Sequence, residues 1–369
     1  MRIVYTIVYN LPYFNFNCNI NYFSITSIFL IVKGAIKMTP RERFLKVLNF
    51  EKPEDRLPMV EWAPWWDQTM KRWIKEGIPG DISYEESLKF FGLDPMILID
   101  AGPISHKCPR PQEYGAPIIT DEKSYEDIRP YLFTDEIIEN VKKQALSLKE
   151  KHDNGEIIIR LWIDGFFWFP RTLFGIEDHF YAFYDYPDLM HRMNEELAEF
   201  NIRVIQELCN ILIPDMVGFA EDMSYNHGPM LSYKLFKEFL MPYYQRVVPY
   251  LDKYCIKNLV DSDGDITEMI PWLIEAGIQG VYPLEKQAGV DIVKIRQKYP
   301  GFLMMDGYDK MVMSKGEEKM RMEFERILPV MKSGGYIPSV DHQTPPEVSL
   351  DNYRIYLKLF EEYAQRAVI

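Results

Sequence analysis

Short apolar runs alternate with longer amphipathic stretches along most of the chain. Eight of the runs have the length and composition of buried strands, and the stretches between them have the apolar spacing of helices. The eight runs cover residues 57–61, 96–100, 157–164, 216–221, 256–261, 278–285, 302–306 and 336–341. Strands separated by helices indicate βαβ units and a parallel sheet, and eight such units predict a closed barrel.

The helical segments have recognisable ends. Thr39 and Pro40 provide an N-cap and a first-turn residue for a lead-in helix over 41–49. Helical spacing continues over 235–250 and 266–275. No linker, low-complexity tract or internal repeat divides the chain after Met38. We therefore expect residues 38–369 to form a single (β/α)8 TIM barrel with an N-terminal lead-in helix.

Residues 1–37 differ in composition from the rest. Residues 3–32 carry no charge and are rich in Ile, Phe, Tyr and Asn. A signal anchor would need roughly 20 apolar residues, whereas the clean apolar run covers only 28–32. We interpret 1–37 as an upstream extension with Met38 as the true start, the alternative being a signal anchor. No membrane association is expected for the mature domain.

Composition and charge narrow the function. The 369 residues are 47% hydrophobic and 26% charged, a balance typical of a globular enzyme. Lys and Arg number 42 against 55 Asp and Glu, and the formal charge of −13 disfavours nucleic acid and anionic membranes as partners. The four cysteines include no CxxC pair, so neither a disulfide framework nor a clustered thiolate metal site is indicated. A cytoplasmic location fits.

Acidic residues end nearly every predicted strand. Taken singly, each acid is better explained as a loop residue or helix N-cap. Together they predict a site, because the carboxyl ends of barrel strands converge on one face. The residues are Glu61, Asp100, Asp164, Glu221, Asp222, Asp261, Asp263, Glu285, Asp306 and Asp341, with His342 beside the last.

So many carboxylates repel one another unless a cation or hydrogen-bond donors offset their charge. Asp261, Asp263 and His342 would give oxygen and nitrogen ligands suited to zinc, manganese or iron. No HExxH-type motif supports this metal site, and His342 could instead be a general acid. We assign catalytic roles to Asp100, Asp164, Glu221 and His342.

Aromatic residues gather after the first and third predicted strands. They would line a pocket for a flat or apolar small molecule, although ordinary packing explains them equally well. The glycines of Ser333-Gly334-Gly335 lack nucleotide-binding spacing. The residues predicted to contact substrate are Glu61, Trp65, Trp66, Phe166, Trp168, Glu285 and Asp306.

Several motifs resemble the uroporphyrinogen decarboxylase (URO-D) superfamily, which includes cobamide-dependent methyltransferases. The resemblance covers about the whole chain after Met38 and implies the TIM-barrel fold. It is carried by Met38-Thr-Pro-Arg-Glu-Arg-Phe with Asp55-Arg56-Leu57-Pro58, by Gly165-Phe166 with Pro170, Thr172 and Leu173, by Ser232 through Phe239 to Pro242-Tyr243, and by Gly334-Gly335-Tyr336-Ile337 through His342 to Pro346.

The sequence departs from both branches of that superfamily. The arginine-rich loop by which decarboxylases grip a porphyrinogen is replaced by Glu61-Trp-Ala-Pro-Trp-Trp-Asp-Gln, and Ile176 stands in place of the family tyrosine. Asp100 and His342 match the decarboxylase acid and histidine. Methyltransferases of the family hold zinc with an HxC pair and a distant Cys, and Asp261, Asp263 and His342 occupy those positions here. Carboxylates in place of thiolates favour an oxygen-bearing substrate or another metal.

The resemblance leaves three functions open. The leading one is a methyltransferase that moves a methyl group between a small substrate and a corrinoid or folate-type carrier, assisted by zinc or another divalent metal, with the corrinoid carried by a partner protein. The second is a decarboxylase (lyase), acting on uroporphyrinogen III to give coproporphyrinogen III in porphyrin biosynthesis, or on a smaller acid. The third is a non-catalytic binding barrel.

Overall fold

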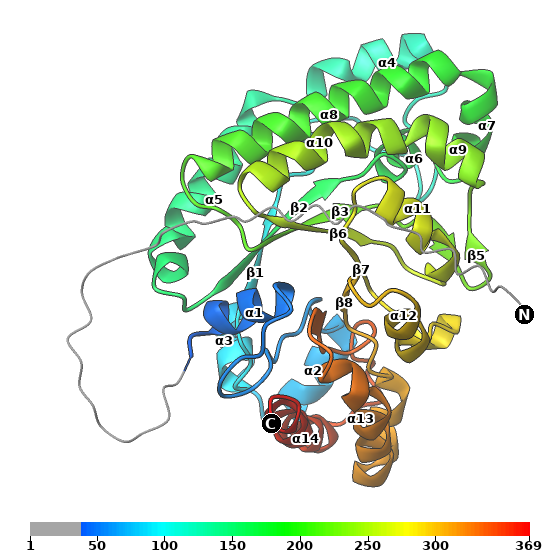
Figure 1. Cartoon of the computed structure of the whole chain (residues 1–369). Helices are drawn as coiled ribbons and strands as arrows, with labels where there is room; N and C mark the ends of the chain where they lie inside the picture. The colour runs from blue at the N-terminus through cyan, green and yellow to red at the C-terminus, as the bar shows by residue number, and fades with distance from the viewer. Residues whose placement is uncertain (1–37) are drawn as a thin grey trace, which may run out of the picture. The chain divides into compact units, whose positions relative to one another are not determined.

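Seven parallel strands form a curled sheet in the order β1-β2-β3-β6-β7-β8-β9 (Figure 1). This computed structural model describes residues 38–369, so the expected extension 1–37 lies outside the described residues. The strands are β1 (Met96–Asp100), β2 (Ile158–Asp164), β3 (Met216–Ala220), β6 (Lys257–Asp261), β7 (Gly280–Tyr282), β8 (Leu303–Met305) and β9 (Tyr336–Ile337). A separate antiparallel pair joins β4 (Ser224–Tyr225) to β5 (Gly228–Pro229).

Helices occupy the connections between the strands, as the apolar spacing predicts. They are α1 (Pro40–Leu48), α2 (Asp67–Lys75), α3 (Tyr84–Phe90), α4 (Glu122–Ile128), α5 (Asp135–Asp153), α6 (Trp168–Phe174), α7 (Asp178–Asp185), α8 (Pro187–Cys209), α9 (Tyr233–Phe239), α10 (Met241–Lys253), α11 (Ile270–Glu275), α12 (Ile292–Lys298), α13 (Glu317–Met331) and α14 (Leu350–Arg366). Short 3₁₀ turns are η1 (Arg129–Tyr131), η2 (Thr267–Met269), η3 (Lys286–Ala288) and η4 (Lys310–Lys315).

The described residues do not form the closed eight-stranded barrel that the sequence predicts. The predicted first strand, 57–61, joins no ladder. Pro58 has no N–H to donate, and the segment makes isolated bonds instead: Leu57 N donates to Ala364 O at 3.1 Å, and Met59 N donates to a carboxylate oxygen of Asp94 at 2.9 Å. The sheet therefore stays open between β1 and β9.

The lead-in helix is confirmed as α1. Thr39 and Glu42 form a capping box, and Pro40 occupies the first turn. The buried Arg43 anchors the helix through Asp94 at 2.7 Å and Asp55 at 2.8 Å. Because Asp94 lies two residues before β1, these ion pairs tie α1 to the start of the sheet.

Two longer helical predictions are interrupted. The pattern over 235–250 is divided between α9 and α10 at Leu240. Pro242 has no backbone N–H, so it cannot donate the hydrogen bond that would continue α9. The pattern over 266–275 begins as the turn η2 and becomes α-helical only at Ile270. The type of structure is predicted correctly in both places.

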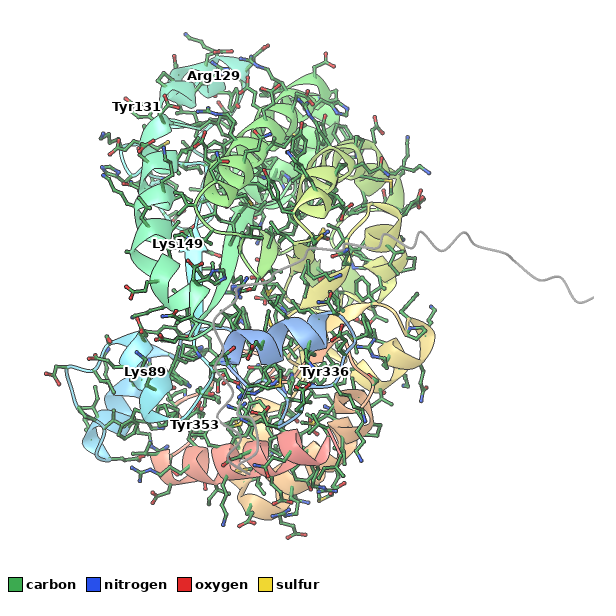
Figure 2. All side chains as sticks on the ribbon, turned by 60° about the vertical axis from the view of Figure 1, so that its left-hand side comes forward. Lys89, Arg129, Tyr131, Lys149, Tyr336 and Tyr353 are labelled. Atoms are coloured by element: carbon green, nitrogen blue, oxygen red, sulfur yellow. The ribbon has the colours of Figure 1, made fainter. Side chains whose placement is uncertain are left out.

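The core is formed by the strands and the inner faces of the helices. Helices α5, α8 and α10 pack along one side of the first four strands of the sheet, and α13 packs against α14 (Figure 1). Tyr336 of β9 and Tyr353 of α14 are buried, whereas Lys89 of α3 and Lys149 of α5 reach the surface (Figure 2). Within residues 38–369, no helix is both long and apolar enough to cross a membrane.

Candidate active site

A cavity of about 250 Å³ lies at the carboxyl ends of the strands. Its walls come from β2, β3 and β6 and the loops that follow them, and also from Trp62 before α2 and His342 after β9. The carboxyl ends of the strands are the place where parallel α/β sheets carry their ligands. It is lined by Trp62, Trp162, Trp168, Ala220, Glu221, Asp222, Asp261, Asp263 and His342.

Three potential metal ligands meet at this cavity. One ligand atom each from Asp263, Glu285 and His342 lies within 4.8 Å of the others, and we call these residues the Asp-Glu-His cluster. His342 Nε2 is 3.7 Å from Asp263 Oδ1. Glu285 is oriented by the backbone N–H of Gly264, which donates to its Oε2 at 2.8 Å. The cluster brings together two residues predicted as metal ligands and one predicted as a substrate contact.

Gly264 is required for this arrangement. Its φ of +88° lies in the left-handed region, and a Cβ there would stand 2.6 Å from the Cα of Tyr225. Only glycine fits such a turn without displacing the neighbouring backbone. The turn carries the chain from β6 past Asp263 and aims the Gly264 N–H at Glu285.

Electrostatics in the Asp-Glu-His cluster favour a bound cation. The pKa of Asp263 is raised to about 7, first by burial and then by the negative charges of Glu285 and Asp222, while Lys310 opposes the rise. Burial lowers the pKa of His342, which keeps the imidazole neutral and able to act as a ligand. Lys310 Nζ lies 4.0 Å from Glu285 and 3.3 Å from Asp341, so one positive charge already borders the cluster.

Asp261 lines the cavity but is not a member of the Asp-Glu-His cluster. It ends β6, and its pKa is raised to about 8 by burial and by the charges of Asp263 and Asp222. The structure therefore brings together Asp263 and His342 of the predicted metal set, with Glu285 as the third residue in reach.

Glu221 is held as a helix cap. Its carboxylate accepts hydrogen bonds from the backbone N–H groups of Phe166, Phe167 and Trp168 at 2.7 to 3.1 Å, and from the hydroxyl of Tyr244. Burial raises its pKa to about 7, against these donors. Glu221 thus fixes the start of α6 and with it the position of Trp168 in the cavity wall.

Asp164 and Asp100 lie at the ends of β2 and β1. The pKa of Asp164 is raised to about 8, first by burial and then by the negative charges of Asp100 and Glu221. Asp100 is exposed and accepts a hydrogen bond from Gly102 N at 2.9 Å. Neither residue lines the cavity, although Asp164 is two positions from Trp162 on the same strand face.

The predicted substrate contacts separate into three groups. Trp168 lines the cavity and Glu285 joins the Asp-Glu-His cluster. Trp66 is an exposed residue at the start of α2. The other four are buried away from the cavity lining: Glu61, Trp65, Phe166 and Asp306.

Two of these buried residues belong to one aromatic cluster. Glu61 accepts a hydrogen bond from the Tyr353 hydroxyl at 2.7 Å, and burial raises its pKa to about 8. Trp65 donates to the same hydroxyl at 3.2 Å and packs against Trp73 and Phe91. Their contacts are those of a structural core.

The sequence reasoning missed Arg160 in the middle of β2. Its side chain is buried, and its guanidinium carbon lies 5.3 to 5.9 Å from the ring centres of Trp62, Trp162 and Tyr282. The available signal was a single charge within an otherwise apolar strand, 157–163.

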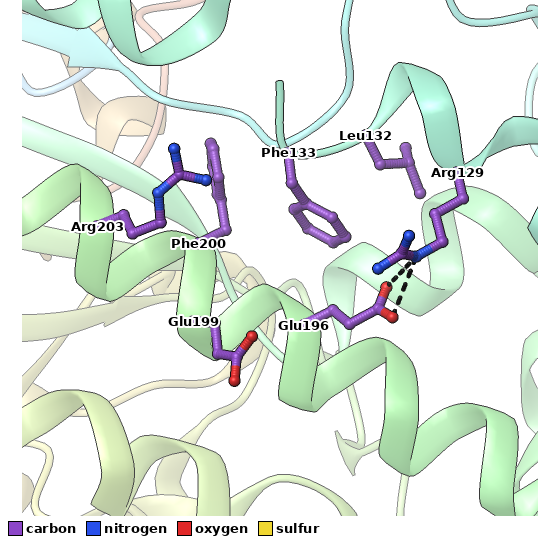
Figure 3. A pocket seen from close by; sticks show the side chains of 7 residues that line it. All are labelled: Arg129, Leu132, Phe133, Glu196, Glu199, Phe200 and Arg203. Carbon is purple, nitrogen blue, oxygen red and sulfur yellow. Dashed lines mark hydrogen bonds and ion pairs between the residues drawn. The ribbon is translucent and has the colours of Figure 1, made fainter. Parts of the chain in front are cut away.

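Another cavity, of about 300 Å³, shares no lining residue with the cavity described above (Figure 3). It is bordered by α8 and the segment around η1, and its lining residues include Arg129, Glu196 and Arg203. Arg129 pairs with Glu196 at 3.2 Å and Arg203 with Asp135 at 2.6 Å. Because its guanidinium groups are already paired, this hollow offers less chemistry than the cavity at the strand ends.

The fold and the cavity define an α/β protein of the curled parallel-sheet class, with its site at the carboxyl edge. The family model of uroporphyrinogen decarboxylase (URO-D) matches residues 171–363, just over half of the chain, and the chain belongs to this family. The resemblance inferred from the motifs is thereby confirmed. No curated protein sequence matches the chain.

One of two solved structures compared with the chain is similar enough to bear on its fold. A methyltransferase from Methanosarcina mazei aligns with a TM-score of 0.57 and 13% identity, covering 89% of this chain and 99% of that chain. A glycoside hydrolase family 5 mannosidase from Rhizomucor miehei aligns with a TM-score of 0.42 and 10% identity, covering 85% and 94% of the two chains. The first shows a shared fold, and the second is too distant to bear on function.

Proposed function

We propose that this URO-D family protein is a methyltransferase that moves a methyl group from a small oxygen-bearing donor to a corrinoid or folate-type carrier, assisted by a divalent cation. The observation that carries the proposal is the Asp-Glu-His cluster on the wall of a tryptophan-lined cavity. The fold shared with the methyltransferase from Methanosarcina mazei is consistent with it.

The donor set fits a borderline divalent cation. Two carboxylate oxygens and one imidazole nitrogen suit zinc, manganese or iron(II). The thiolate site that the resemblance implies for methyltransferases does not fit, because no cysteine lines the cavity among the described residues. A harder, oxygen-rich site is better matched to an ether or alcohol oxygen than to a thiol.

The residues of the chain have separable tasks in this reaction. When bound, the cation would act as a Lewis acid toward the donor oxygen. Trp62, Trp162 and Trp168 would hold a flat donor and exclude water. As the carbon–oxygen bond breaks, its electron pair stays on oxygen, and the carrier supplies the pair for the new bond to the methyl group. Asp261, which lines the cavity and whose pKa is raised to about 8, mainly by burial, would deliver the proton to that oxygen.

Metal analysis tests the cation first. Protein purified without a histidine tag is expected to carry about one divalent ion per chain. Asp263→Ala, Glu285→Ala and His342→Ala should each lose it, whereas His227→Ala, at an exposed histidine outside the cluster, should retain it. Wild-type protein without stoichiometric metal, or His342→Ala with a full complement, would remove the cation from the proposal.

Methyl transfer is tested separately. The protein is incubated with cob(I)alamin and a panel of methoxylated small molecules, and formation of methylcobalamin is followed by its absorbance. We expect turnover with at least one donor and its loss in Asp261→Asn. Metal-loaded protein that methylates neither cob(I)alamin nor tetrahydrofolate from any donor would contradict the proposed transfer.

A decarboxylase is the second candidate, because the family model carries that name and because Asp100 stands exposed at the end of β1. Its substrate would be uroporphyrinogen III or a smaller acid. A direct assay for coproporphyrinogen formation distinguishes the two candidates. We expect no product, since the acidic cavity would repel a tetrapyrrole with many carboxylates, and clear turnover would reverse the preference.

A further inference from the structure

Asp341 immediately precedes His342 of the Asp-Glu-His cluster, in the loop after β9. Its side chain is fully buried, and its backbone N–H donates to Tyr308 O at 2.8 Å. Tyr308 and Val340 also form a parallel bridge beyond the ends of β8 and β9. The backbone at Asp341 is therefore fixed to the loop after β8, and this contact limits where His342 can lie.

The carboxylate of Asp341 caps two 3₁₀ turns at once. It accepts the backbone N–H of Lys286 at 3.0 Å and that of Lys310 at 3.2 Å, one on each oxygen. Lys286 and Lys310 are the first residues of η3 and η4, and the first N–H groups of a helical turn find no acceptor inside the turn itself. One buried side chain thereby joins the loops that follow β7, β8 and β9.

Two of the three cluster members lie on the loops that Asp341 joins. Glu285 immediately precedes Lys286, and His342 immediately follows Asp341. The hydrogen bond from Lys286 N to Asp341 Oδ2 therefore connects the residues next to these two ligands. Ligand atoms of Glu285 and His342 lie within 4.8 Å of each other, as this connection requires of neighbouring residues.

Asp341 also pairs with a cation beside the cluster. Lys310 Nζ is 3.3 Å from Asp341 Oδ1 and 4.0 Å from Glu285 Oε1. Because Asp341 is fully buried, its attraction for the ammonium group is weakly screened by solvent. The shorter contact holds Lys310 toward Asp341 and leaves Glu285 Oε1 for a metal ion.

We propose that Asp341 is a positioning residue that sets Glu285 against His342 in the geometry that a divalent ion needs. The proposal rests on the proposed function, because it assigns part of the metal affinity of the cluster to a residue that does not touch the ion. Groups that orient metal ligands from behind typically change metal affinity by roughly 10- to 100-fold when they are removed.

Zinc affinity measures this role. Asp341→Asn keeps the size of the side chain but places an amide nitrogen where an oxygen accepted a hydrogen bond, so one of the two capping bonds is lost. Competition with a chromogenic chelator should show zinc binding at least about tenfold weaker than in wild type. A zinc affinity within about threefold of wild type overturns the proposal.

Asp215 provides a matched control at the amino ends of the strands. It directly precedes β3, is buried, accepts the backbone N–H of Ile159 at 2.8 Å and pairs with Arg41 at 2.7 Å and His152 at 3.1 Å. Asp215→Asn should lower the urea midpoint at least as much as Asp341→Asn does, yet leave zinc affinity within about threefold. Equal losses of zinc affinity would mean that general destabilisation is the cause, and would overturn the positioning role.

A second pair of variants serves if Asp341→Asn does not fold. Lys310→Met/Asp341→Asn removes both charges and leaves no buried cation unpaired, whereas Lys310→Met alone retains both capping bonds, because its backbone N–H is unchanged. The double variant should bind zinc at least about tenfold more weakly than Lys310→Met does. Equal affinities of these two proteins would contradict the proposal.

Metal-free protein distinguishes this proposal from the proposed function. Wild-type protein that binds no zinc removes the cation from the proposed function, and crystal structures and hydrogen exchange without metal then decide the positioning role. Faster exchange of the Lys286 and Lys310 amides in Asp341→Asn, with a wider separation of Glu285 and His342, supports that role. An unchanged separation of Glu285 and His342 overturns it, whatever the metal result.

Discussion

His342 Nε2 lies 3.7 Å from Asp263 Oδ1, although one residue follows β9 and the other follows β6. The imidazole ring stands edge-on to Trp62, with ring centres 5.6 Å apart and an interplanar angle of 82°. The tryptophan fixes the direction of the imidazole, so that the nitrogen faces the carboxylate. All three residues line the cavity at the carboxyl ends of the strands.

Members of the Asp-Glu-His cluster should contribute more to zinc affinity than their neighbour Asp261 does. Glu285→Gln removes a carboxylate whose oxygen is within reach of a shared ion and should lower zinc affinity at least about tenfold. Asp261→Asn lies outside the cluster and should change it by less than about threefold. Competition with a chromogenic chelator measures both. A larger loss in Asp261→Asn than in Glu285→Gln would restore the ligand set expected from the sequence.

Glu221→Gln should destabilise the fold by about 1–3 kcal/mol, because the amide group cannot accept all the hydrogen bonds that the carboxylate receives. Urea unfolding followed by circular dichroism measures the change. Tyr244→Phe removes one donor of the same set and should cost less, about 1 kcal/mol. A Glu221→Gln protein as stable as wild type would contradict the capping role.

Glu61 should make stability fall with rising pH. Its pKa is about 8 in the folded protein against 4.5 for an ordinary glutamate, so the folded state retains a proton that the unfolded state releases. The stabilisation is complete below pH 4.5 and is lost progressively as the pH rises to about 8. Glu61→Gln should flatten the pH dependence of the unfolding free energy in this window. An unchanged slope would place a charged Glu61 in the folded state.

His179 should act in the opposite pH range. Burial lowers its pKa from 6.5 to about 3, and neither ring nitrogen has a hydrogen-bond partner among the described residues. The unfolded state therefore binds a proton that the folded state excludes, and stability falls as the pH drops from 6.5 toward 3. His179→Phe, matched to the neighbouring Phe167 and Phe183, should remove this dependence and stabilise the protein at pH 5. Thermal unfolding at pH 5 and pH 7.5 compares the two proteins, and parallel shifts in melting temperature would exclude the titration.

Local pattern is enough to predict the repeating strands and helices. Seven of the eight predicted strands form. An apolar run between two helical patterns can be recognised from residues that are close in the sequence, so these strands could be predicted without knowing the fold. The eighth, 57–61, does not pair, since Pro58 removes a donor and a ladder also needs a partner edge that no local pattern describes. The lead-in helix follows from Thr39 and Glu42 alone.

The positions of the acids in the sequence also predict that they gather at the strand ends, but the tertiary structure decides what each acid does. Glu285 reaches Asp263 because β6 and β7 are neighbours in the sheet, whereas Asp261, two residues before Asp263, faces another part of the cavity. Glu61 and Phe166 look like site residues in the sequence and lie in the core. Residue type alone does not show whether such a side chain lies in the core or in the site, because the same types occur in both.

The sequence by itself therefore determined an α/β protein with an acidic, aromatic site at the carboxyl ends of its strands, because periodicity and strand termination are local properties. Only the tertiary structure decided that Asp263, Glu285 and His342 meet, and that Arg160 is buried among the rings of Trp62, Trp162 and Tyr282. The physical reason is that distances between side chains from different strands depend on sheet order and register, which the amino-acid pattern of one strand does not contain.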